Sequence, residues 1–190
     1  MKRAVFLDRD GTINHDTGFI SHPDSFEIYP FAAEAIKTLN NLGLYVFVVT
    51  NQSGIARGLY TEDDLKLVHQ KMIEQLAKQY AKLDQIYFAP YHVDGVVEPY
   101  NINHKDRKPG LGMFNRAKRE YEFDTKGSFM VGDRYTDIAF GKRAGLQTIL
   151  VLTGEGEREF LENRNSWEYK PDYIVKDLVA AVKLIEQRVG

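Results

Sequence analysis

The sequence predicts an α/β fold, a three-layer sandwich with a mostly parallel sheet between two layers of helices. Short apolar runs alternate along the 190 residues with segments whose apolar residues recur at helical spacing. Such βαβα order is typical of parallel sheets. Polar residues follow three of the apolar runs directly. The length and the 43% of hydrophobic residues suit one domain, over residues 1–190, with a full core.

Six short runs are predicted to be strands. Ala4–Leu7 is apolar and ends abruptly at Asp8, which indicates a buried strand. Leu44–Val49 is rich in β-branched and aromatic residues, as buried strands are. The other predicted strands are Gln85–Phe88, Ser128–Val131, Gln147–Leu152 and Asp172–Val175.

Five segments are predicted to be helices. The longest begins after Thr61, a residue type that caps helices, and its first turn holds Glu62, Asp63 and Asp64, which favour the positive end of a helix. Its apolar stripe is Leu65, Val68, Met72 and Leu76. The other predicted helices are Phe31–Leu42, Leu111–Tyr121, Tyr135–Ala144 and Leu178–Arg188. Pro90–Pro109 is predicted to be irregular, because it contains Pro, Gly, Asn and His.

Composition excludes several classes of function. The net charge of −2, from 25 basic and 27 acidic residues, gives no electrostatic reason to expect nucleic acid or a membrane as partner. The absence of cysteine excludes disulfides, thiolate metal sites and cysteine nucleophiles. No apolar run is long enough for a signal peptide or a membrane span. We therefore expect a cytoplasmic protein, acting as a monomer on a small molecule.

Two carboxylates follow the first strand, in Asp8-Arg9-Asp10-Gly11-Thr12. Residues two apart near a strand end point to the same side, so both carboxylates can face one pocket. One can attack phosphorus once a cation lowers its repulsion with phosphate, and the other can move protons. A turn capped by two Asp residues is an equally common explanation of this segment alone.

Two further segments supply groups that bind phosphate. Thr50-Asn51-Gln52-Ser53 follows the second strand with small hydrogen-bonding side chains, although an ordinary polar loop is the commoner explanation. Arg107-Lys108 supplies cations before a helix, although lone pairs of this kind are mostly solvated.

A third acidic segment, Gly132–Asp137, follows the fourth strand. Asp8 and Asp133 with a backbone carbonyl would give the hard oxygen ligands that suit Mg²⁺, although Asp133 and Asp137 can also be helix caps. The carboxyl ends of parallel strands meet at one rim, where such sheets bind ligands. Four acidic side chains there would repel a phosphate monoester unless Mg²⁺ and Lys108 neutralised them.

Taken together, these segments resemble the haloacid dehalogenase (HAD) superfamily. DRDGT at Asp8–Thr12, Thr50, Lys108 and GDRYTD at Gly132–Asp137 match its four motifs in order and spacing. The resemblance implies a Rossmann-like fold. It also implies that Asp8 is the nucleophile, Asp10 the general acid/base, and Thr50 and Lys108 the groups that hold the phosphoryl group. Mg²⁺ would be bound by Asp8, the main-chain carbonyl of Asp10, and Asp133.

A narrower resemblance is carried by FLDRDGTIN, VVTNQSGIARG, RKP and MVGD. These segments are similar to D-glycero-D-manno-heptose-1,7-bisphosphate 7-phosphatases and the related histidinol-phosphate phosphatases. That group has no cap domain, and Thr50 follows Asp8 by only 42 positions, which leaves no room for one here. The substrate contacts implied by the resemblance are Asp16, Thr17, Gly18, Phe19, Thr50, Asn51, Gln52, Ser53, Arg107 and Arg134.

The chain departs from that group at one place. Many members bind a structural zinc through a Cys-x-His and Cys-x-Cys pattern, where this chain has Ala89, Tyr91, His104 and Asp106. Structural zinc is therefore not expected, and Tyr91 and Tyr100 are expected to pack the loop instead. The sequence also indicates that three histidines lie on the surface or in a flap. These are His15, His22 and His69.

Three functions stay open at this point. The leading hypothesis is hydrolysis of the 7-phosphate of a heptose bisphosphate, whose second phosphate Arg107 and Arg134 would hold. A histidinol-phosphate phosphatase or a broader phosphomonoesterase is the alternative, since Asp16 could accept an amine. The alternative of a different class is an inactive phospholigand-binding module. The argument against it is that every catalytic position of the family is present in this chain.

Overall fold

Six parallel strands form one sheet in the computed structural model, which describes residues 1–190. The strand order is β3-β2-β1-β4-β5-β6, so the order reverses between β1 and β4. The strands are β1 (Ala4–Leu7), β2 (Tyr45–Asn51), β3 (Gln85–Ala89), β4 (Phe129–Gly132), β5 (Gln147–Val151) and β6 (Tyr173–Val175). The predicted parallel sheet is confirmed, and β2 extends far enough to include Thr50.

Six α-helices and one 3₁₀ turn connect the strands. They are η1 (Pro23–Ser25), α1 (Ala32–Asn41), α2 (Glu62–Ala77), α3 (Gly112–Glu120), α4 (Tyr135–Ala144), α5 (Gly156–Asn163) and α6 (Leu178–Val189). Five α-helices lie where the sequence predicts them. The prediction missed α5, whose sequence GEREFLEN has only two large apolar residues and so no visible periodicity.

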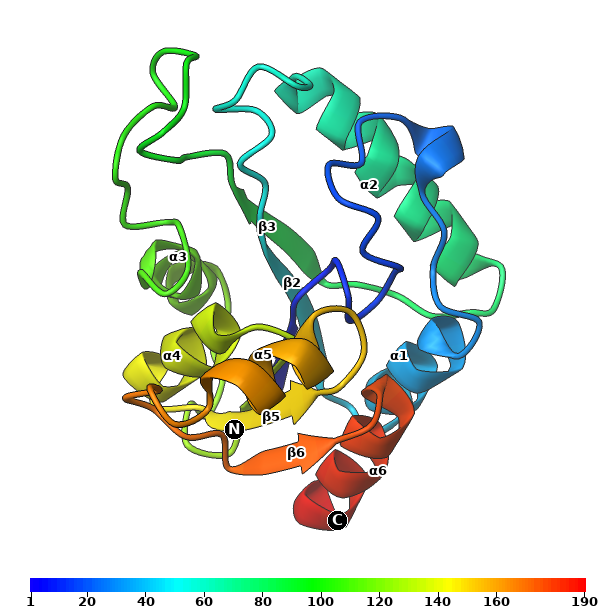
Figure 1. Ribbon diagram of the computed structural model, residues 1–190. Helices are drawn as coiled ribbons and strands as arrows, with labels where there is room; N and C mark the ends of the chain where they lie inside the picture. Colours follow the sequence, from blue (N-terminus) through cyan, green and yellow to red (C-terminus); the bar gives the residue numbers. More distant parts are fainter.

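Helices pack on both faces of the sheet, because successive residues of β1 point to opposite faces. Val5 and Leu7 belong to a buried cluster with residues of α1, α2 and α6. Ala4 and Phe6 point the other way, into a second cluster with residues of α3 and α4. Figure 1 shows these two layers, with α1, α2 and α6 on one side of the strands and α3 and α4 on the other.

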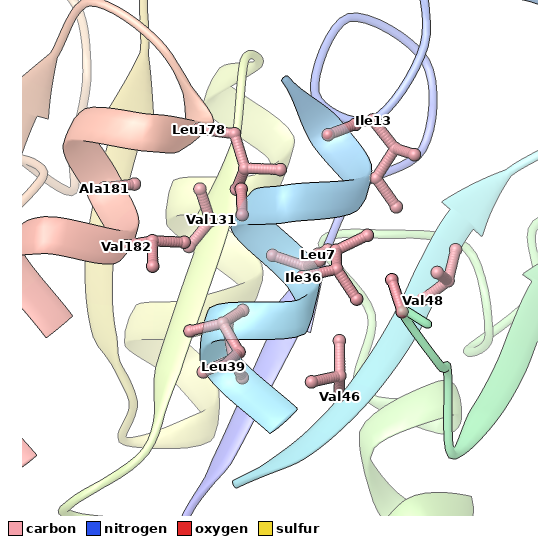
Figure 2. Packing of buried hydrophobic residues seen from close by; sticks show 14 of the residues in the cluster. Leu7, Ile13, Ile36, Leu39, Val46, Val48, Val131, Leu178, Ala181 and Val182 are labelled. Carbon is pink, nitrogen blue, oxygen red and sulfur yellow. The ribbon is translucent and has the colours of Figure 1, made fainter. Parts of the chain in front are cut away.

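The first of these clusters holds α1 and α6 against the strands. Figure 2 shows Ile36 and Leu39 of α1 meeting Leu7 of β1 and Val46 of β2, while Leu178 of α6 lies beside Val131 of β4. Most of these side chains are wholly buried, and each stabilises the fold by roughly 1.5–3 kcal/mol relative to exposure. The sheet is therefore a rigid base for the loops at its edge.

The long helix α2 begins as the sequence predicts. The hydroxyl of Thr61 accepts a hydrogen bond from the backbone N–H of Asp64, whose carboxylate accepts one from the N–H of Thr61. The predicted apolar stripe is at most 1% exposed and consists of Leu65, Val68, Met72 and Leu76.

The surface location predicted for His69 is wrong. Its side chain is buried, and its ring lies 6.1 Å from the ring of Phe88. His69 lies one turn beyond Leu65 and so shares the buried face of α2. His15 and His22 are exposed, as predicted.

The connections at the rim contain no inserted domain. Between β1 and β2 the chain forms only η1 and α1, and between β2 and β3 only α2. Residues 90–111 contain no helix or strand, in agreement with the predicted irregular segment. None of the helices is long and apolar enough to cross a membrane.

Candidate active site

Asp8 and Lys108 form a buried ion pair where β1 ends. The ammonium Nζ of Lys108 lies 2.9 Å from Oδ1 of Asp8 and 2.6 Å from Oδ1 of Asp137, and it donates to the carbonyl of Val49 at 2.7 Å. The side chains of Lys108 and Asp8 are 2% and 9% exposed. The pair joins segments 100 residues apart, since Asp8 directly follows the central strand β1 and Lys108 lies in the loop before α3.

Two carboxyl groups near Lys108, those of Asp8 and Asp133, have raised pKa values. Burial raises the pKa of Asp8 to about 7, and the nearby charge of Asp137 adds to this, while Lys108 opposes it. Burial raises the pKa of Asp133 well above its ordinary value, helped by the charges of Asp8 and Asp137. Burial and the neighbouring carboxylates therefore outweigh the nearby cations at both groups, Lys108 at Asp8 and Arg134 at Asp133.

The predicted second carboxylate, Asp10, is held by five hydrogen bonds. Arg9 donates to both of its oxygens, Asn14 to Oδ1 at 2.9 Å and Gln52 to Oδ2 at 2.9 Å. Burial raises the pKa of Asp10, but the charge of Arg9 and the hydrogen bonds outweigh it, so the pKa lies below the usual range. The wholly buried Arg9 was not predicted as a site residue.

Asp8 and Asp133 offer oxygens that fit a hard cation. Single carboxylate oxygens of Asp8, Asp133 and Asp137 all lie within 4.8 Å of one another. Oδ1 of Asp133 is buried without a hydrogen-bond partner, whereas Oδ2 accepts from the N–H of Glu155. Gly11, at φ +79°, makes room for Asp133, since a Cβ there would lie 2.1 Å from Oδ2. The pocket thus suits Mg²⁺.

The other carboxylate of this group, Asp137, has a different role. Its Oδ1 pairs with Lys108, and its Oδ2 accepts a hydrogen bond from the backbone N–H of Arg134 at 2.9 Å. Asp137 therefore both caps α4 and holds the ammonium group of Lys108 in place. The side-chain oxygens of Asp10 lie outside the cation group, so only its main-chain carbonyl stays a predicted ligand.

The end of β2 and the residue that follows it lie against the same site. Thr50 is 1% exposed, and its hydroxyl accepts a hydrogen bond from the side chain of Gln52 at 2.8 Å. The side-chain amide of Asn51 donates to the carbonyl of Lys108 and accepts from its N–H, at 3.2 and 2.9 Å. Asn51 therefore fixes the backbone from which the Lys108 side chain extends.

A cavity of about 630 Å³ opens over these residues. It brings together all the predicted catalytic residues and all the predicted substrate contacts except Thr17, which is exposed beside it. The other predicted contacts that line it are Asp16, Gly18, Phe19, Asn51, Gln52, Ser53, Arg107 and Arg134.

The cavity also has a wall that the sequence did not predict. Glu159 and Asn163 of α5 line it, together with Ser166 and Trp167, which follow α5. Trp167 stacks on Tyr135, with ring centroids 5.2 Å apart. No signal marked these residues, because α5 itself has no clear periodicity. The unpredicted lining residues are Tyr60, Tyr135, Thr136, Glu159, Asn163, Ser166 and Trp167.

The two arginines of the rim differ in their partners. Arg134 pairs with Asp16 at 2.8 Å and lies 3.9 Å from Glu159, so carboxylates already surround its guanidinium group. Arg107 forms no ion pair and donates only to the carbonyl of Tyr91, at 3.2 Å. Burial and the nearby charge of Arg57 lower the pKa of Arg107. Arg107 is thus the cation of the rim that can still accept an anionic partner.

The loop before Arg107 is packed by side chains. The ring of Tyr91 stacks on that of His104, with centroids 3.9 Å apart, and lies 6.0 Å from the ring of Tyr100. Asp106 lies 3.6 Å from Arg116. Ala89 has no atom that can bind a metal, and Tyr91 is engaged in stacking, so these positions do not fit a tetrahedral zinc site.

The chain is similar to known proteins along almost all of its length. The family model described as "HAD-hyrolase-like" matches residues 106–181. The D-glycero-beta-D-manno-heptose-1,7-bisphosphate 7-phosphatase of Rhodopseudomonas palustris is 40% identical over 75% of this chain and 79% of its own. The D-glycero-D-manno-heptose-1,7-bisphosphate 7-phosphatase of Thermosynechococcus vestitus is 40% identical over 96% of this chain and 94% of its own.

A solved structure agrees with these relatives. The D,D-heptose 1,7-bisphosphate phosphatase of B. bronchiseptica, complexed with magnesium and phosphate, is 32% identical and superposes with a TM-score of 0.85. The match covers 98% of this chain and 99% of that one. The chain therefore belongs to the HAD superfamily, as a phosphatase of the D-glycero-D-manno-heptose-1,7-bisphosphate 7-phosphatase group.

Proposed function

We propose that this phosphatase removes the 7-phosphate of D-glycero-D-manno-heptose 1,7-bisphosphate through a phosphoaspartate on Asp8. The observation that carries the reaction is the pairing of Asp8 with Lys108 on the floor of one cavity that Asp10 also lines. The names of the relatives and the free guanidinium group of Arg107 support the substrate.

In the first step, a carboxylate oxygen of Asp8 attacks phosphorus and the bond from phosphorus to the sugar oxygen breaks. Asp10 gives its proton to the departing oxygen, because an alkoxide is a poor leaving group. The approaching phosphate dianion raises the pKa of Asp10 and so favours the protonated form that this step needs. Lys108 and the hydroxyl of Thr50 would stabilise the charge on the transferred phosphoryl group.

In the second step, water attacks phosphorus and gives a proton to Asp10, and the bond between phosphorus and Asp8 breaks. Asp10 is then back in its starting form, and inorganic phosphate leaves. The hydrogen bonds that hold Asp10 as a carboxylate favour this step, in which it acts as a base. When bound, Mg²⁺ would neutralise the charge shared by Asp8, Asp133 and the phosphate.

The rim supports a bisphosphate substrate. A second phosphate near Arg107 would form charge-assisted hydrogen bonds that no protein carboxylate now makes. The guanidinium group of Arg134 already pairs with Asp16, so we assign it to holding the segment that contains Asp16 and the sugar rather than a phosphate. The amine of histidinol phosphate would be repelled by Arg107, although Glu159 and Asp16, which also line the cavity, could accept an amine.

Steady-state kinetics on three substrates test the assignment. With Mg²⁺ present, kcat/KM should be higher for the heptose bisphosphate than for histidinol phosphate or p-nitrophenyl phosphate. A higher value for histidinol phosphate would overturn the substrate. No release of phosphate from any of them would indicate the inactive binding module.

The Arg107→Ala variant tests the rim. It should raise KM for the bisphosphate by about tenfold or more, because a charge-assisted contact remote from phosphorus is lost, and change it little for p-nitrophenyl phosphate. Arg119→Ala, on the exposed face of α3, serves as the matched control. Equal effects on both substrates would exclude a recognition role for Arg107.

Three further properties stay predictions. They are a single domain over residues 1–190, a monomer, and a cytoplasmic location without nucleic-acid or membrane partners. Sedimentation would test the oligomeric state, and cell fractionation the location.

A further inference from the structure

Gln52 lines the cavity, but its side chain is bound to the protein rather than open to a ligand. Its amide nitrogen Nε2 donates to Oδ2 of Asp10 at 2.9 Å and to Oγ1 of Thr50 at 2.8 Å. Its oxygen Oε1 accepts from the hydroxyl of Tyr60 at 2.6 Å. The residue is 2% exposed.

These contacts use both N–H groups of the amide. A side-chain amide has two N–H donors and one oxygen acceptor, and here Asp10 and Thr50 take one donor each. No donor is left for a phosphate or a sugar hydroxyl. The position that the sequence marked as a substrate contact therefore acts on the substrate only through its neighbours.

The same contacts fix the direction of the Thr50 hydroxyl. A hydroxyl group has one proton, and the Gln52 amide occupies an acceptor position on Oγ1. The proton of Thr50 makes no hydrogen bond within the protein and stays available on the cavity side, where a phosphoryl oxygen would lie. One amide thus orients the group that holds the phosphoryl oxygen and the group that moves the proton.

Tyr60 sets the orientation of the amide. Its ring is buried against Ile55 and Leu65, and its hydroxyl proton can point only to the oxygen end of Gln52. Gly54 permits this packing, because a Cβ there would lie 2.1 Å from the Tyr60 ring. Burial raises the pKa of Tyr60 to about 12, so the hydroxyl keeps its proton at neutral pH.

We propose that Gln52 is a positioning residue of the reaction, which holds Asp10 and Thr50 in register, and that Tyr60 fixes Gln52 for this task. The proposal rests on the proposed function, since it deepens the roles of Asp10 and Thr50 in phosphoryl transfer. The proposal gives a physical reason for the presence of Gln52 and Gly54 in this segment, since an ordinary polar loop would not require these two residues.

The variant Gln52→Met tests this, because methionine keeps the length and removes both donors. On an alkyl ester such as glycerol 1-phosphate, kcat should fall by about 10²-fold while KM changes little, because the leaving alkoxide needs the proton of Asp10. On p-nitrophenyl phosphate, whose leaving group needs no proton, formation of the phosphoaspartate should be slowed much less. Its hydrolysis should be slow, so that a burst approaching one nitrophenolate per chain precedes the steady state.

Tyr60→Phe removes one hydroxyl and leaves the ring packing intact, so it decides the question if Gln52→Met does not fold. It should give the same pattern at about three- to tenfold, the size of one lost hydrogen bond. Tyr80→Phe, on a side chain 85% exposed, is the matched control.

Two results would overturn the proposal. A raised KM with unchanged kcat would mean that Gln52 contacts the substrate directly, and an equal fall of kcat on both esters without a burst would mean that it does not position Asp10. If the unmodified protein releases phosphate neither from these esters nor from the heptose bisphosphate, the proposed function itself fails. If the unmodified protein cleaves both and the variants behave like it, only the positioning role fails.

Discussion

At the scale of single residues, the site depends on one buried lysine among several carboxylates. Lys108 pairs with Asp8 and Asp137, and Asp133 lies beside them without a cation of its own. Burying a carboxylate without a partner costs several kcal/mol. The buried carboxylates therefore repel one another in the folded protein, and a bound cation would reduce this repulsion.

Replacing the nucleophile should abolish turnover and leave the fold intact. Asp8→Asn should lower kcat by at least about 10³-fold, because an amide cannot attack phosphorus, while the melting temperature stays the same or rises. Phosphate release and thermal unfolding measure the two effects. Asp63→Asn, on the exposed surface of α2, is the control. Near-normal activity of Asp8→Asn would contradict the phosphoaspartate mechanism.

His69 should make the protein sensitive to acid. Burial lowers the pKa of His69 to about 3, with a further contribution from the charge of Arg9. The unfolded chain, with its ordinary pKa near 6.5, binds a proton that the folded protein refuses. The stabilisation is thus complete above pH 6.5 and is lost as the pH falls from there toward 3.

The variant His69→Phe removes this contribution. Between pH 7 and pH 4.5 the unmodified protein should lose about 2–3 kcal/mol more of its free energy of unfolding than the variant does. Urea unfolding at the two pH values measures the difference. Parallel losses in the two proteins would show that His69 can be protonated in the folded state.

At the scale of elements, the loop of residues 90–111 and helix α5 are the parts whose structure the local sequence pattern predicts least well. The loop is held by the stacked rings of Tyr91 and His104 and by Asp106 beside Arg116. Helix α5 packs on β5 and Trp167 follows it into a cluster with Ile138. These contacts leave no periodic pattern in the sequence. Those of the loop join residues that are not close in sequence, and α5 is too short to show a helical period.

The loop should be ordered without zinc. Elemental analysis of the purified protein should find no stoichiometric zinc, and Tyr91→Ala should lower the free energy of unfolding by about 1 kcal/mol or more through lost stacking. Tyr80→Ala is the control. One tightly held zinc per chain, lost in a His104→Ala variant, would contradict this expectation.

At the scale of the whole molecule, cation binding should be coupled to folding. The acidic pocket joins β1 to β4, so a cation that binds only the folded chain stabilises the entire sheet. At a Mg²⁺ concentration of about 100 times Kd the gain should be about 2.7 kcal/mol. EDTA should remove both this gain and the activity, and added Mg²⁺ should restore them.

The variant Asp133→Asn distinguishes the repulsion among the buried carboxylates from the binding of Mg²⁺. Without Mg²⁺ the variant should melt higher than the unmodified protein, because a buried negative charge is gone, and Mg²⁺ should stabilise it much less. Calorimetry with and without Mg²⁺ measures both effects. Equal stabilisation of the two proteins by Mg²⁺ would place the cation elsewhere.

The sequence by itself determined the order of the elements and the four motifs of the site. Periodicity, caps and turn residues are local properties, so all six strands and five of the six α-helices could be predicted, together with Asp8, Asp10, Thr50 and Lys108. The parallel order also predicted that these residues share one rim, because all strands of such a sheet end at the same edge.

Only the tertiary structure decided what each side chain does there. It showed that Asp137 holds Lys108, that Arg134 is already paired while Arg107 is free, and that Gln52 bonds Asp10 and Thr50. Apart from the hydrogen bond between Gln52 and Thr50, these contacts join residues distant in sequence, and their distances depend on how helices and loops pack over the sheet. Local pattern carries no information on such distances, because hydrogen-bond partners are set by the fold and not by neighbours in sequence.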